Sequence, residues 1–474
     1  MALNPIYFES FIVCLGVALI LLESIQKEKN RMFIAWIGTG GLVAVSLFLF
    51  IYGRQFTSVS PFYSADRLAS FYKLLIVVAT ILVLLMSLSY SRVTTADRKI
   101  RTGAGEFFIL PIFACAGMMW LVSASDLIFL FVTLELVTIV FYVLVAYTRY
   151  DALCLEAAVK YFVLGAFSTG FLVYGISWIF GVTGQTNFEK ISGVLRTLPP
   201  SASPALLFGL GLVLIAVGFK IAAFPFQFWV PDVYQGAPTP VTAYLSVASK
   251  AAGFVILLRM VEVFSPILQA KILGILSVLA GLTVFFGNLA ALLQTNLKRL
   301  LAYSSIAHAG FLLIGVSSVS VPFAPKAVSF YMGAYLFMTL LAFFAVVMVS
   351  RETGGEEMTN FRGLGKRSPL LAISMVLAML SLAGIPLTAG FFGKFFIFMV
   401  AIQAHQWALV GLGTLGVCCG FYYYLKIIGV MYWQTCPVGA AGIKISADTA
   451  FILVVLCISI ILLGIFPQLL LALL

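Results

Sequence analysis

Apolar stretches of about membrane length recur along this chain, and they constrain its fold more than any other feature. A transmembrane helix needs roughly 20 consecutive apolar residues, and about 14 segments of the chain meet that requirement. Of the 474 residues, 62% are hydrophobic and only 9% are charged, whereas soluble domains carry roughly 25% charged residues. The sequence therefore predicts an all-α polytopic membrane protein.

Only short loops separate the predicted segments. The segments cover residues 3–22, 32–52, 70–90, 107–125, 127–147, 155–181, 205–229, 241–263, 270–293, 300–320, 327–350, 370–402, 407–433 and 450–472. No loop is long enough to hold a nucleotide, a flavin or an iron–sulfur cluster, and no glycine-rich or Walker motif lies between a strand and a helix. We therefore expect this chain to bind no cofactor itself.

The net charge and the cysteines are both explained by a membrane location. The charge of +11 would favour nucleic acid in a soluble chain, but lysine and arginine also collect in cytoplasmic loops, so we expect no nucleic-acid partner. The seven cysteines form no CxxC motif or Cys/His cluster, which predicts free thiols and no metal site. The first apolar segment lacks a basic region and a cleavage site, so no cleaved signal peptide is expected.

The distribution of basic residues predicts the orientation. Loops after odd-numbered segments hold Lys27, Lys29, Arg31, Arg92, Arg98, Lys99, Arg101, Arg149, Lys298, Arg299, Arg351, Arg362, Lys366, Arg367 and Lys444. Loops after even-numbered segments hold Arg54, Arg67, Lys190, Arg196, Lys271 and Lys326. Because basic loops face the cytoplasm, the odd loops are expected there, with both termini on the periplasmic side of a bacterial cytoplasmic membrane.

Residues 211–250 contain a broken membrane segment with a lysine on each side of the break. Lys220 lies deep in an apolar run, the run is interrupted at Pro225, and Lys250 lies near the middle of the next apolar segment. A lysine at the bilayer centre costs about 2.5–3.5 kcal/mol on insertion scales. Two such lysines beside a broken helix indicate a functional site.

A second break suggests that the chain contains an internal duplication. Gly384 and Pro386 interrupt the twelfth segment, and Lys394 follows within an apolar run. The broken segments are the seventh and the twelfth, and an odd offset of five makes equivalent segments cross in opposite directions. The prediction is two inverted five-helix repeats, each with a broken helix, as in many secondary transporters. Within a single membrane domain (1–474), the predicted parts are an N-terminal three-helix segment (1–104), the repeats (105–263 and 264–435) and a C-terminal helix (436–474).

Four other titratable residues lie within apolar segments. Glu135 is the only acidic residue well inside segments four to eight, and it is either a proton carrier or a locally hydrogen-bonded structural carboxylate. His308, beside two serines, is either a proton relay or a satisfied core histidine. Lys160 is equally compatible with a buried and an interfacial position. Lys426 lies among aromatic residues typical of a membrane interface, to which its side chain is expected to snorkel, and the tyrosines around it need no functional explanation.

Ion pairs among such groups have the energy that proton translocation requires. A carboxylate about 4 Å from an ammonium gains about 4 kcal/mol at an effective dielectric constant near 20. Moving one charge through 100 mV costs about 2.3 kcal/mol. Making or breaking one ion pair can therefore drive a proton on or off a neighbouring lysine against a membrane potential.

Four stretches resemble the antiporter-like membrane subunits of respiratory complex I. They are GFKIAAFPFQFWVPDVYQGAPTPVTAYLSVASK (218–250), QTNLKRLLAYSSIAHAGF (294–311), SLAGIPLTAGFFGKF (381–395) and YFVLGAFSTGFLVYG (161–175). The resemblance covers residues 105–435, and the PDVYQGAP stretch is similar to the N branch of the family rather than to its L and M branches. A lysine at position 394 argues against the M branch, and the lack of a long lateral helix argues against the L branch.

The resemblance implies a non-redox, proton-translocating subunit of the membrane arm of an NADH:quinone oxidoreductase. Its partners are then the other membrane-arm and peripheral-arm subunits, which hold NADH, FMN, the iron–sulfur clusters and quinone. Carried over by position, Glu135 and Lys220 form an ion pair, Lys250 is the central relay, His308 connects it onward and Lys394 is the far terminal site.

One departure from the family and one rival function remain open. Where the family often has histidine after Pro-Phe in the broken segment, this chain has Gln227. Glutamine does not carry a proton at neutral pH, so the link between Lys220 and Lys250 is expected to use water. The rival is a subunit of a cation/proton antiporter or of a ferredoxin- or hydrogenase-linked complex, which shares the repeats and the lysines.

Overall fold

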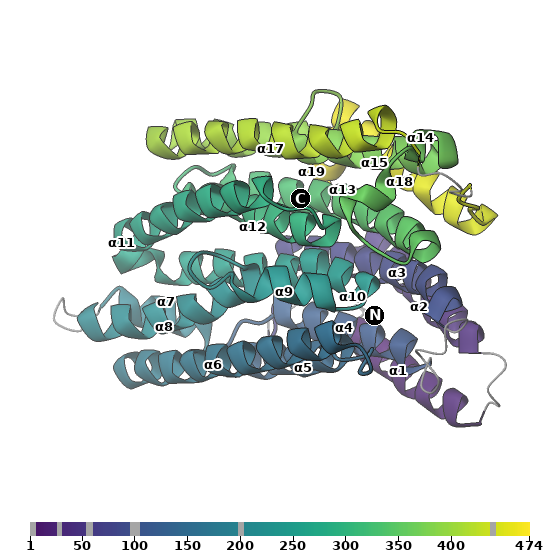
Figure 1. Ribbon diagram of the computed structural model, residues 1–474. Coiled ribbons are helices and arrows are strands. Elements are labelled where there is room, and N and C mark those ends of the chain that lie inside the picture. Colours follow the sequence, from purple (N-terminus) through teal and green to yellow (C-terminus); the bar gives the residue numbers. More distant parts are fainter. Residues whose placement is uncertain (1–5, 26–30, 54–59, 95–104, 198–202, 437–441) are drawn as a thin grey trace. The chain divides into compact units, whose positions relative to one another are not determined.

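The structure is a computed structural model that describes residues 6–25, 31–53, 60–94, 105–197, 203–436 and 442–474 (Figure 1). In these ranges it is helical, and the only β-structure is three isolated bridges. Twelve described stretches are long and apolar enough to cross a membrane. Helix α4 (Glu106–Val122) and the pair α15 (Pro369–Ala383) and α16 (Ala389–Gln403), which together fill the broken twelfth segment, account for the remaining predicted segments. The predicted all-α polytopic fold is confirmed.

The chain divides into two compact units, which interleave along the sequence. Unit 1 comprises residues 1–88, 99–222 and 236–275, and unit 2 comprises residues 89–98, 223–235 and 276–474. The division at 275/276 falls inside helix α11 (Lys250–Leu292), which runs across both the eighth and the ninth predicted segments without a loop. The repeat boundary predicted between residues 263 and 264 remains a prediction.

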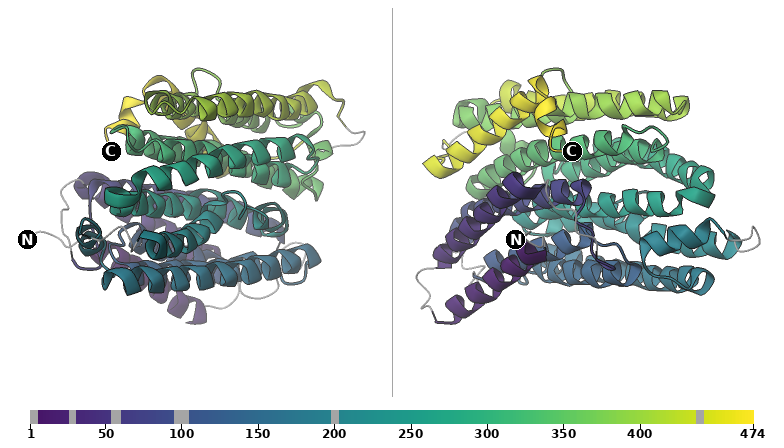
Figure 2. Two further views of the ribbon diagram at one scale, coloured as in Figure 1. Left: turned by 90° about the vertical axis from the view of Figure 1, so that its left-hand side faces the viewer. Right: turned by 180° about the vertical axis from the view of Figure 1, so that it is seen from behind.

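Unit 1 contains the N-terminal helices and α8, which ends at the first break (Figures 1 and 2). Its elements are α1 (Ile6–Ile25), α2 (Arg31–Tyr52), α3 (Arg67–Thr94, to residue 88), α4, α5 (Leu127–Val145), α6 (Ala152–Thr183), α7 (Phe188–Leu195), α8 (Ser203–Ile221), α10 (Thr239–Tyr244), the π-helix η4 (Leu245–Ser249) and the first part of α11. Helix α4 packs against α1, α2 and α5, and α6 packs along α8. The segment from α10 to the first turns of α11 is completely buried, so it forms the core of this unit.

Unit 2 is built around α12 (Leu297–Ser317) and α13 (Ala324–Thr353), which are almost entirely buried. The other elements are α9 (Trp229–Gly236), the second part of α11, η5 (Met358–Phe361), α14 (Leu364–Arg367), α15, α16, α17 (Trp407–Trp433), α18 (Ala447–Ile465) and α19 (Gln468–Leu471). Helix α13 contacts α12, α15, α16 and α18. The break between α15 and α16 therefore lies against the most buried helix of the unit.

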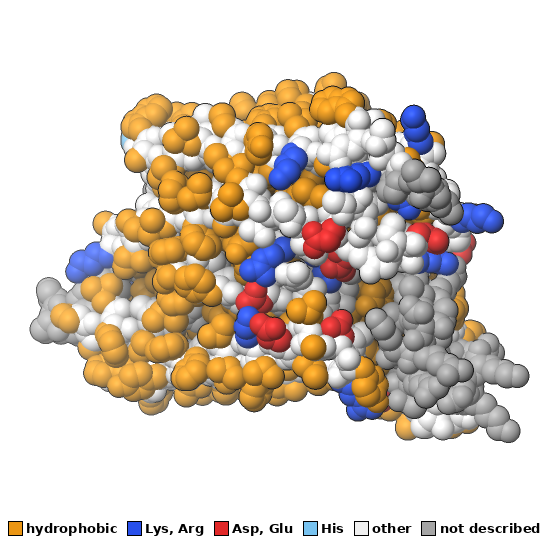
Figure 3. Space-filling view, in the orientation of Figure 1, with side chains coloured by type: hydrophobic (Ala, Val, Ile, Leu, Met, Phe, Trp, Pro, Cys, Tyr) orange, Lys and Arg blue, Asp and Glu red, His pale blue; other side chains and the backbone are white. Residues whose placement is uncertain are grey.

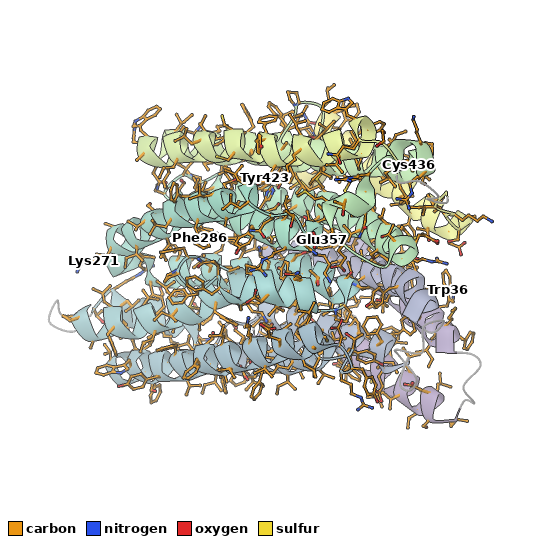
Figure 4. All side chains as sticks on the ribbon, in the orientation of Figure 1. Trp36, Lys271, Phe286, Glu357, Tyr423 and Cys436 are labelled. Carbon is orange, nitrogen blue, oxygen red and sulfur yellow. The ribbon has the colours of Figure 1, made fainter. Side chains whose placement is uncertain are left out.

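The same helix connection occurs once in each unit. In unit 1, Asp126 caps the N-terminus of α5 and forms a β-bridge with Asn187, just after α6. In unit 2, Asn296 caps α12 and forms a β-bridge with Glu357, just after α13 (Figure 4). Two backbone hydrogen bonds of 2.9 Å flank each bridge. This shared connection supports the predicted duplication, whereas the inverted orientation of the repeats stays a prediction.

The outer faces of the helices are apolar, as a lipid environment requires. Hydrophobic side chains cover most of the face drawn in Figure 3, and charged side chains gather in a few places. Of the basic residues used to predict the orientation, Lys27, Lys29, Arg54, Arg98, Lys99 and Arg101 lie outside the described residues. Lys298 and Arg299 belong to the first turn of α12 rather than to a loop, and Lys298 is buried in an ion pair with Glu356 at 3.0 Å.

Candidate functional site: buried lysines at two broken helices

Lys220 occupies the last turn of α8, immediately before the first break. Its side chain is only 6% exposed, and its Nζ atom has no hydrogen-bond partner among the described residues. The nearest recorded interaction is with the ring of Phe141, whose centroid lies 5.7 Å from Nζ. An ammonium in this position is a buried charge without a direct counter-ion, which is an expensive arrangement.

Glu135 on α5 is the acidic group that acts on Lys220. The two are close enough to interact electrostatically, but the predicted direct ion pair is wrong for this structure, because Nζ of Lys220 has no hydrogen-bond partner in the part of the chain that the structure describes. Glu135 instead accepts a hydrogen bond of 2.6 Å from the Thr169 hydroxyl of α6. Thr169 therefore holds the carboxylate while the lysine remains unpaired.

Lys250 begins α11 directly after the π-helical turn η4 and is 1% exposed. Three residues further on, Gly253 lies on the same face of α11, because residues i and i+3 are neighbours on a helix. A Cβ atom at Gly253 would lie 3.4 Å from Cγ of Lys220. The stem of Lys220 therefore lies against the face of α11 that carries Lys250, and unit 1 brings the two lysines to one region.

Lys394 on α16 follows the second break and is 6% exposed. Its Nζ donates hydrogen bonds of 2.8 Å to the carbonyl oxygens of Leu382 and Ala383. These carbonyls belong to the last turn of α15, where the break leaves them without helical partners. Nζ also lies 5.2 Å from the ring centroid of Phe311 on α12. Lys394 thus has partners that Lys220 lacks.

His308 on α12 is the centre of a buried hydrogen-bonded chain in unit 2. Its Nδ1 lies 2.6 Å from the Tyr331 hydroxyl of α13, and its Nε2 lies 3.2 Å from the Tyr424 hydroxyl of α17. The Tyr424 hydroxyl is also hydrogen-bonded to Ser304. Hydroxyl and imidazole groups both donate and accept, so this chain is able to pass a proton between three helices.

The expectation that the tyrosines near Lys426 belong to an interfacial belt is wrong for two of them. Tyr423 and Tyr424 are 2% and 1% exposed, and Tyr423 donates to Asn288 at 3.1 Å (Figure 4). Tyr422, the residue before them on α17, is exposed. Their positions differ because 100° per residue turns successive helical residues to different faces. Lys426 itself is exposed, as snorkelling predicts.

Lys160 lies on the outer face of α6. It forms an ion pair of 2.7 Å with Glu156, one helical turn earlier, and both side chains are substantially exposed. This arrangement decides the open question about Lys160 in favour of a surface position.

Gln227 faces a small polar cavity in unit 2. It is fully buried, and neither of its amide atoms has a hydrogen-bond partner among the described residues. The cavity has a volume of about 170 Å³ and is also lined by Asp232 and Arg299, which form an ion pair of 2.8 Å. This volume accommodates several water molecules. The expected water link between Lys220 and Lys250 through Gln227 remains a prediction.

Sequence reasoning missed Thr169, Tyr331 and Tyr424, together with the π-helical turn before Lys250. Each side chain carries a hydroxyl inside an apolar helix, which was the available signal. A threonine hydroxyl on a helix more often bonds to its own backbone, and a tyrosine in a membrane helix is also typical of the membrane interface. Nothing in the sequence indicates the π-helical turn, although such turns are frequent at functional sites.

Comparisons with known proteins agree with this arrangement. Residues 124–420 match the family described as "NADH:quinone oxidoreductase/Mrp antiporter, TM". The chain is 39% identical over 472 residues to NADH-quinone oxidoreductase subunit N of Trichlorobacter lovleyi, covering 99% of this chain and 95% of the relative. It is 39% identical over 465 residues to the subunit of the same name from Moorella thermoacetica, covering 98% and 96%.

Solved structures show the same fold. A chain of respiratory complex I from Thermus thermophilus with bound aureothin matches with a TM-score of 0.81 and 30% identity, covering 98% of both chains. A chain of the membrane-bound sulfane sulfur reductase, an archaeal respiratory membrane complex, matches with a TM-score of 0.88 and 25% identity, covering 98% of this chain and 95% of the other. This chain therefore belongs to the NADH:quinone oxidoreductase/Mrp antiporter family of membrane proteins, in the branch that contains the N subunits of NADH-quinone oxidoreductase.

Proposed function

We propose that this chain is the proton-translocating, non-redox membrane subunit of an NADH:quinone oxidoreductase. Near-full-length similarity to N subunits supports the assignment. Its partners are the other membrane-arm and peripheral-arm subunits, which bind NADH, FMN, iron–sulfur clusters and quinone, and membrane lipids surround it. The chain itself binds no cofactor and no nucleic acid. It lies in the bacterial cytoplasmic membrane with both termini on the periplasmic side.

The observation that carries the mechanism is the unpartnered ammonium of Lys220. It is buried beside Glu135 without touching it, so a small movement of either side chain makes or breaks an ion pair. At about 4 Å and an effective dielectric constant near 20, that pair is worth about 4 kcal/mol. The gain exceeds the roughly 2.3 kcal/mol needed to move one charge through 100 mV.

The proposed cycle uses the three residues of unit 1 first. Quinone reduction elsewhere in the complex shifts the pairing of Glu135 with Lys220, and the ammonium that loses its partner releases its proton toward Lys250. Re-pairing then favours reloading of Lys220 from the cytoplasmic side. Thr169 supports this switch, because its hydroxyl holds Glu135 when the pair is open.

In unit 2 the proposed carriers are His308 and Lys394. The hydrogen bonds from His308 to Tyr331 and Tyr424 provide donors and acceptors for rapid proton exchange. The two carbonyl acceptors of Lys394 bind its ammonium more strongly than they would bind a neutral amine. Lys394 therefore serves as a terminal site with a well-defined protonated state.

The alternative is a subunit of a different respiratory or antiporter complex. It is favoured by the TM-score of 0.88 with a chain of the sulfane sulfur reductase. The peripheral proteins that co-purify with the chain distinguish the two, because an NADH dehydrogenase module is expected only for the first.

The test is proton translocation by the intact complex in proteoliposomes. We expect Lys220→Ala and Glu135→Ala to assemble normally and to lower NADH-driven proton translocation and coupled turnover by at least about tenfold, or 1.4 kcal/mol. Lys426→Ala, which changes an exposed lysine of α17, is the matched control and should translocate normally. Normal translocation in both Lys220→Ala and Glu135→Ala would overturn the proposal.

A further inference from the structure

A second buried ion pair lies in the N-terminal helices of unit 1, and no step of the proposed cycle uses it. Glu9 of α1 and Lys73 of α3 are 0% and 2% exposed, and the distance from Oε1 to Nζ is 2.7 Å. The hydroxyl of Tyr63, in the segment before α3, donates to Oε1 of Glu9 at 3.0 Å and accepts from Nζ of Lys73. The three groups form a closed triangle of titratable side chains.

The triangle is incompletely satisfied, unlike a purely structural ion pair. The second carboxylate oxygen of Glu9 is buried and has no hydrogen-bond partner among the described residues. Unpaired buried polar atoms are rare and call for an explanation, such as a proton carrier or a water site.

The backbone around Tyr63 connects this triangle to a large cavity that is lined in part by charged side chains. Residue 63 forms a β-bridge with Ala124, flanked by hydrogen bonds from Ser64 N to Ser123 O (2.8 Å) and from Ser125 N to Phe62 O (3.0 Å). Successive residues of extended backbone point to opposite sides. The Tyr63 side chain therefore points to Glu9, and the next residue, Ser64, lines the cavity.

The cavity itself carries charges of both signs. Its volume is about 540 Å³, and its lining includes Ser64, Ser125, Glu189, Arg259 and Glu262. The guanidinium of Arg259 is fixed, because its nitrogens lie 2.9 and 3.0 Å from the carboxylate oxygens of Asp66. A cavity of this size lined by charged groups is hydrated.

We propose that Glu9, Lys73 and Tyr63 form a second proton-carrying site of this chain, and that the cavity lined by Ser64, Glu189 and Glu262 is its aqueous access route. This inference rests on the proposed function, to which it adds a site outside the repeats. A proton that passes from the Lys73 ammonium to the Glu9 carboxylate leaves a neutral amine and a neutral acid, so the net charge is unchanged. Tyr63 relays by giving its hydroxyl proton to Glu9 while accepting one from Lys73.

The decisive variant removes both charges at once. Breaking a buried ion pair by changing one partner is strongly destabilising, whereas replacing both partners is often neutral. The double variant Glu9→Gln/Lys73→Met is therefore expected to assemble with the complex, but to lower NADH-driven proton translocation in proteoliposomes at least about tenfold, since Tyr63 is left without the donor and the acceptor between which it relays. Tyr63→Phe, which removes only a hydroxyl, should lower it by a smaller factor and keeps the test valid if the double variant does not assemble.

A control variant tests whether the loss of any buried hydroxyl of these helices slows translocation. Thr80→Val removes another buried hydroxyl of α3, which bonds to Tyr244 at 2.7 Å, and should leave translocation unchanged.

Comparison with Lys220→Ala distinguishes this inference from the proposed function. If the double variant and Tyr63→Phe both translocate normally while Lys220→Ala is slow, the proposed function stands and this inference is overturned. If the double variant is slow while Lys220→Ala is normal, the N-terminal site stands and the Lys220 switch fails. Full recovery in the double variant of a defect seen in Glu9→Gln alone would show that the pair is only structural.

Discussion

The two broken helices place a lysine beside a break in different ways. Lys220 precedes its break and has no hydrogen-bond partner among the described residues, whereas Lys394 follows its break and donates to two carbonyl oxygens of α15. A buried ammonium is stabilised by hydrogen bonds to acceptors that are otherwise unpaired. The comparison indicates that Lys220 is free to make or break an ion pair with Glu135, and that Lys394 also caps the C-terminal end of α15.

The backbones at the breaks differ in a related way. The second break begins at Gly384, which has a φ angle of 90°, and the first begins at Ala222, which has a φ angle of 64°. Glycine adopts a positive φ without steric cost, whereas a residue with a Cβ atom incurs about 1–2 kcal/mol. The first break therefore begins with a strained residue two positions after Lys220. The second begins without strain at Gly384, although Leu387 further along it has a φ angle of 70°.

The largest expected difference concerns stability. Lys394→Met removes both hydrogen bonds and leaves the carbonyls of Leu382 and Ala383 buried without donors, which costs about 2–4 kcal/mol. Lys220→Met keeps a similar side-chain volume and removes a buried charge that makes no hydrogen bond, so the fold should be at least as stable as the wild type. The measurement is the thermal unfolding temperature of the purified complex, with subunit retention as a second readout.

The two lysine variants control for each other, because both exchange one buried lysine for methionine. Equal losses of stability would show that the two lysines play the same structural role. The inference that Lys394 stabilises its break and Lys220 does not would then be wrong, whatever the two variants do to proton translocation.

The sequence was sufficient for the fold class and for the positions of the breaks. Membrane-length apolar segments determine the fold class, and Pro225 and Gly384 mark the positions of the two breaks. The sequence did not predict which side chains the buried titratable residues contact. Whether Glu135 contacts Lys220 or Thr169 depends on side-chain directions on three helices, and a difference of one helical position decides it. Glu9 and Lys73 were overlooked because both lie in the three helices before the predicted repeats.

The second prediction concerns the residue with a positive φ angle at the start of each break. Gly384→Ala should destabilise the protein by about 1–2 kcal/mol through its positive φ, and its Cβ would lie 2.9 Å from Cδ of Lys394. Ala222→Gly should stabilise it by up to about 1 kcal/mol, because the strain is relieved at a modest entropic cost. Thermal unfolding of the two variants measures both effects, and shifts of the same sign would contradict the assignment of strain to Ala222 rather than to Gly384.

The smallest effect is expected at Gly253, which lies beneath the stem of Lys220. A Cβ atom there would lie 2.7 Å from Cγ2 of Ile221 and 3.4 Å from Cγ of Lys220, so Gly253→Ala must displace the end of α8 slightly. Its crowding cost and the roughly 0.8–1 kcal/mol gain in helix propensity partly cancel, which leaves stability nearly unchanged. The moved lysine should instead slow proton translocation about threefold, or roughly 0.7 kcal/mol. Gly274→Ala is the matched control on the same helix, because its Cβ would meet no atom within 4 Å; if both alanines slow translocation equally, the effect belongs to α11 as a whole and not to the position of Lys220.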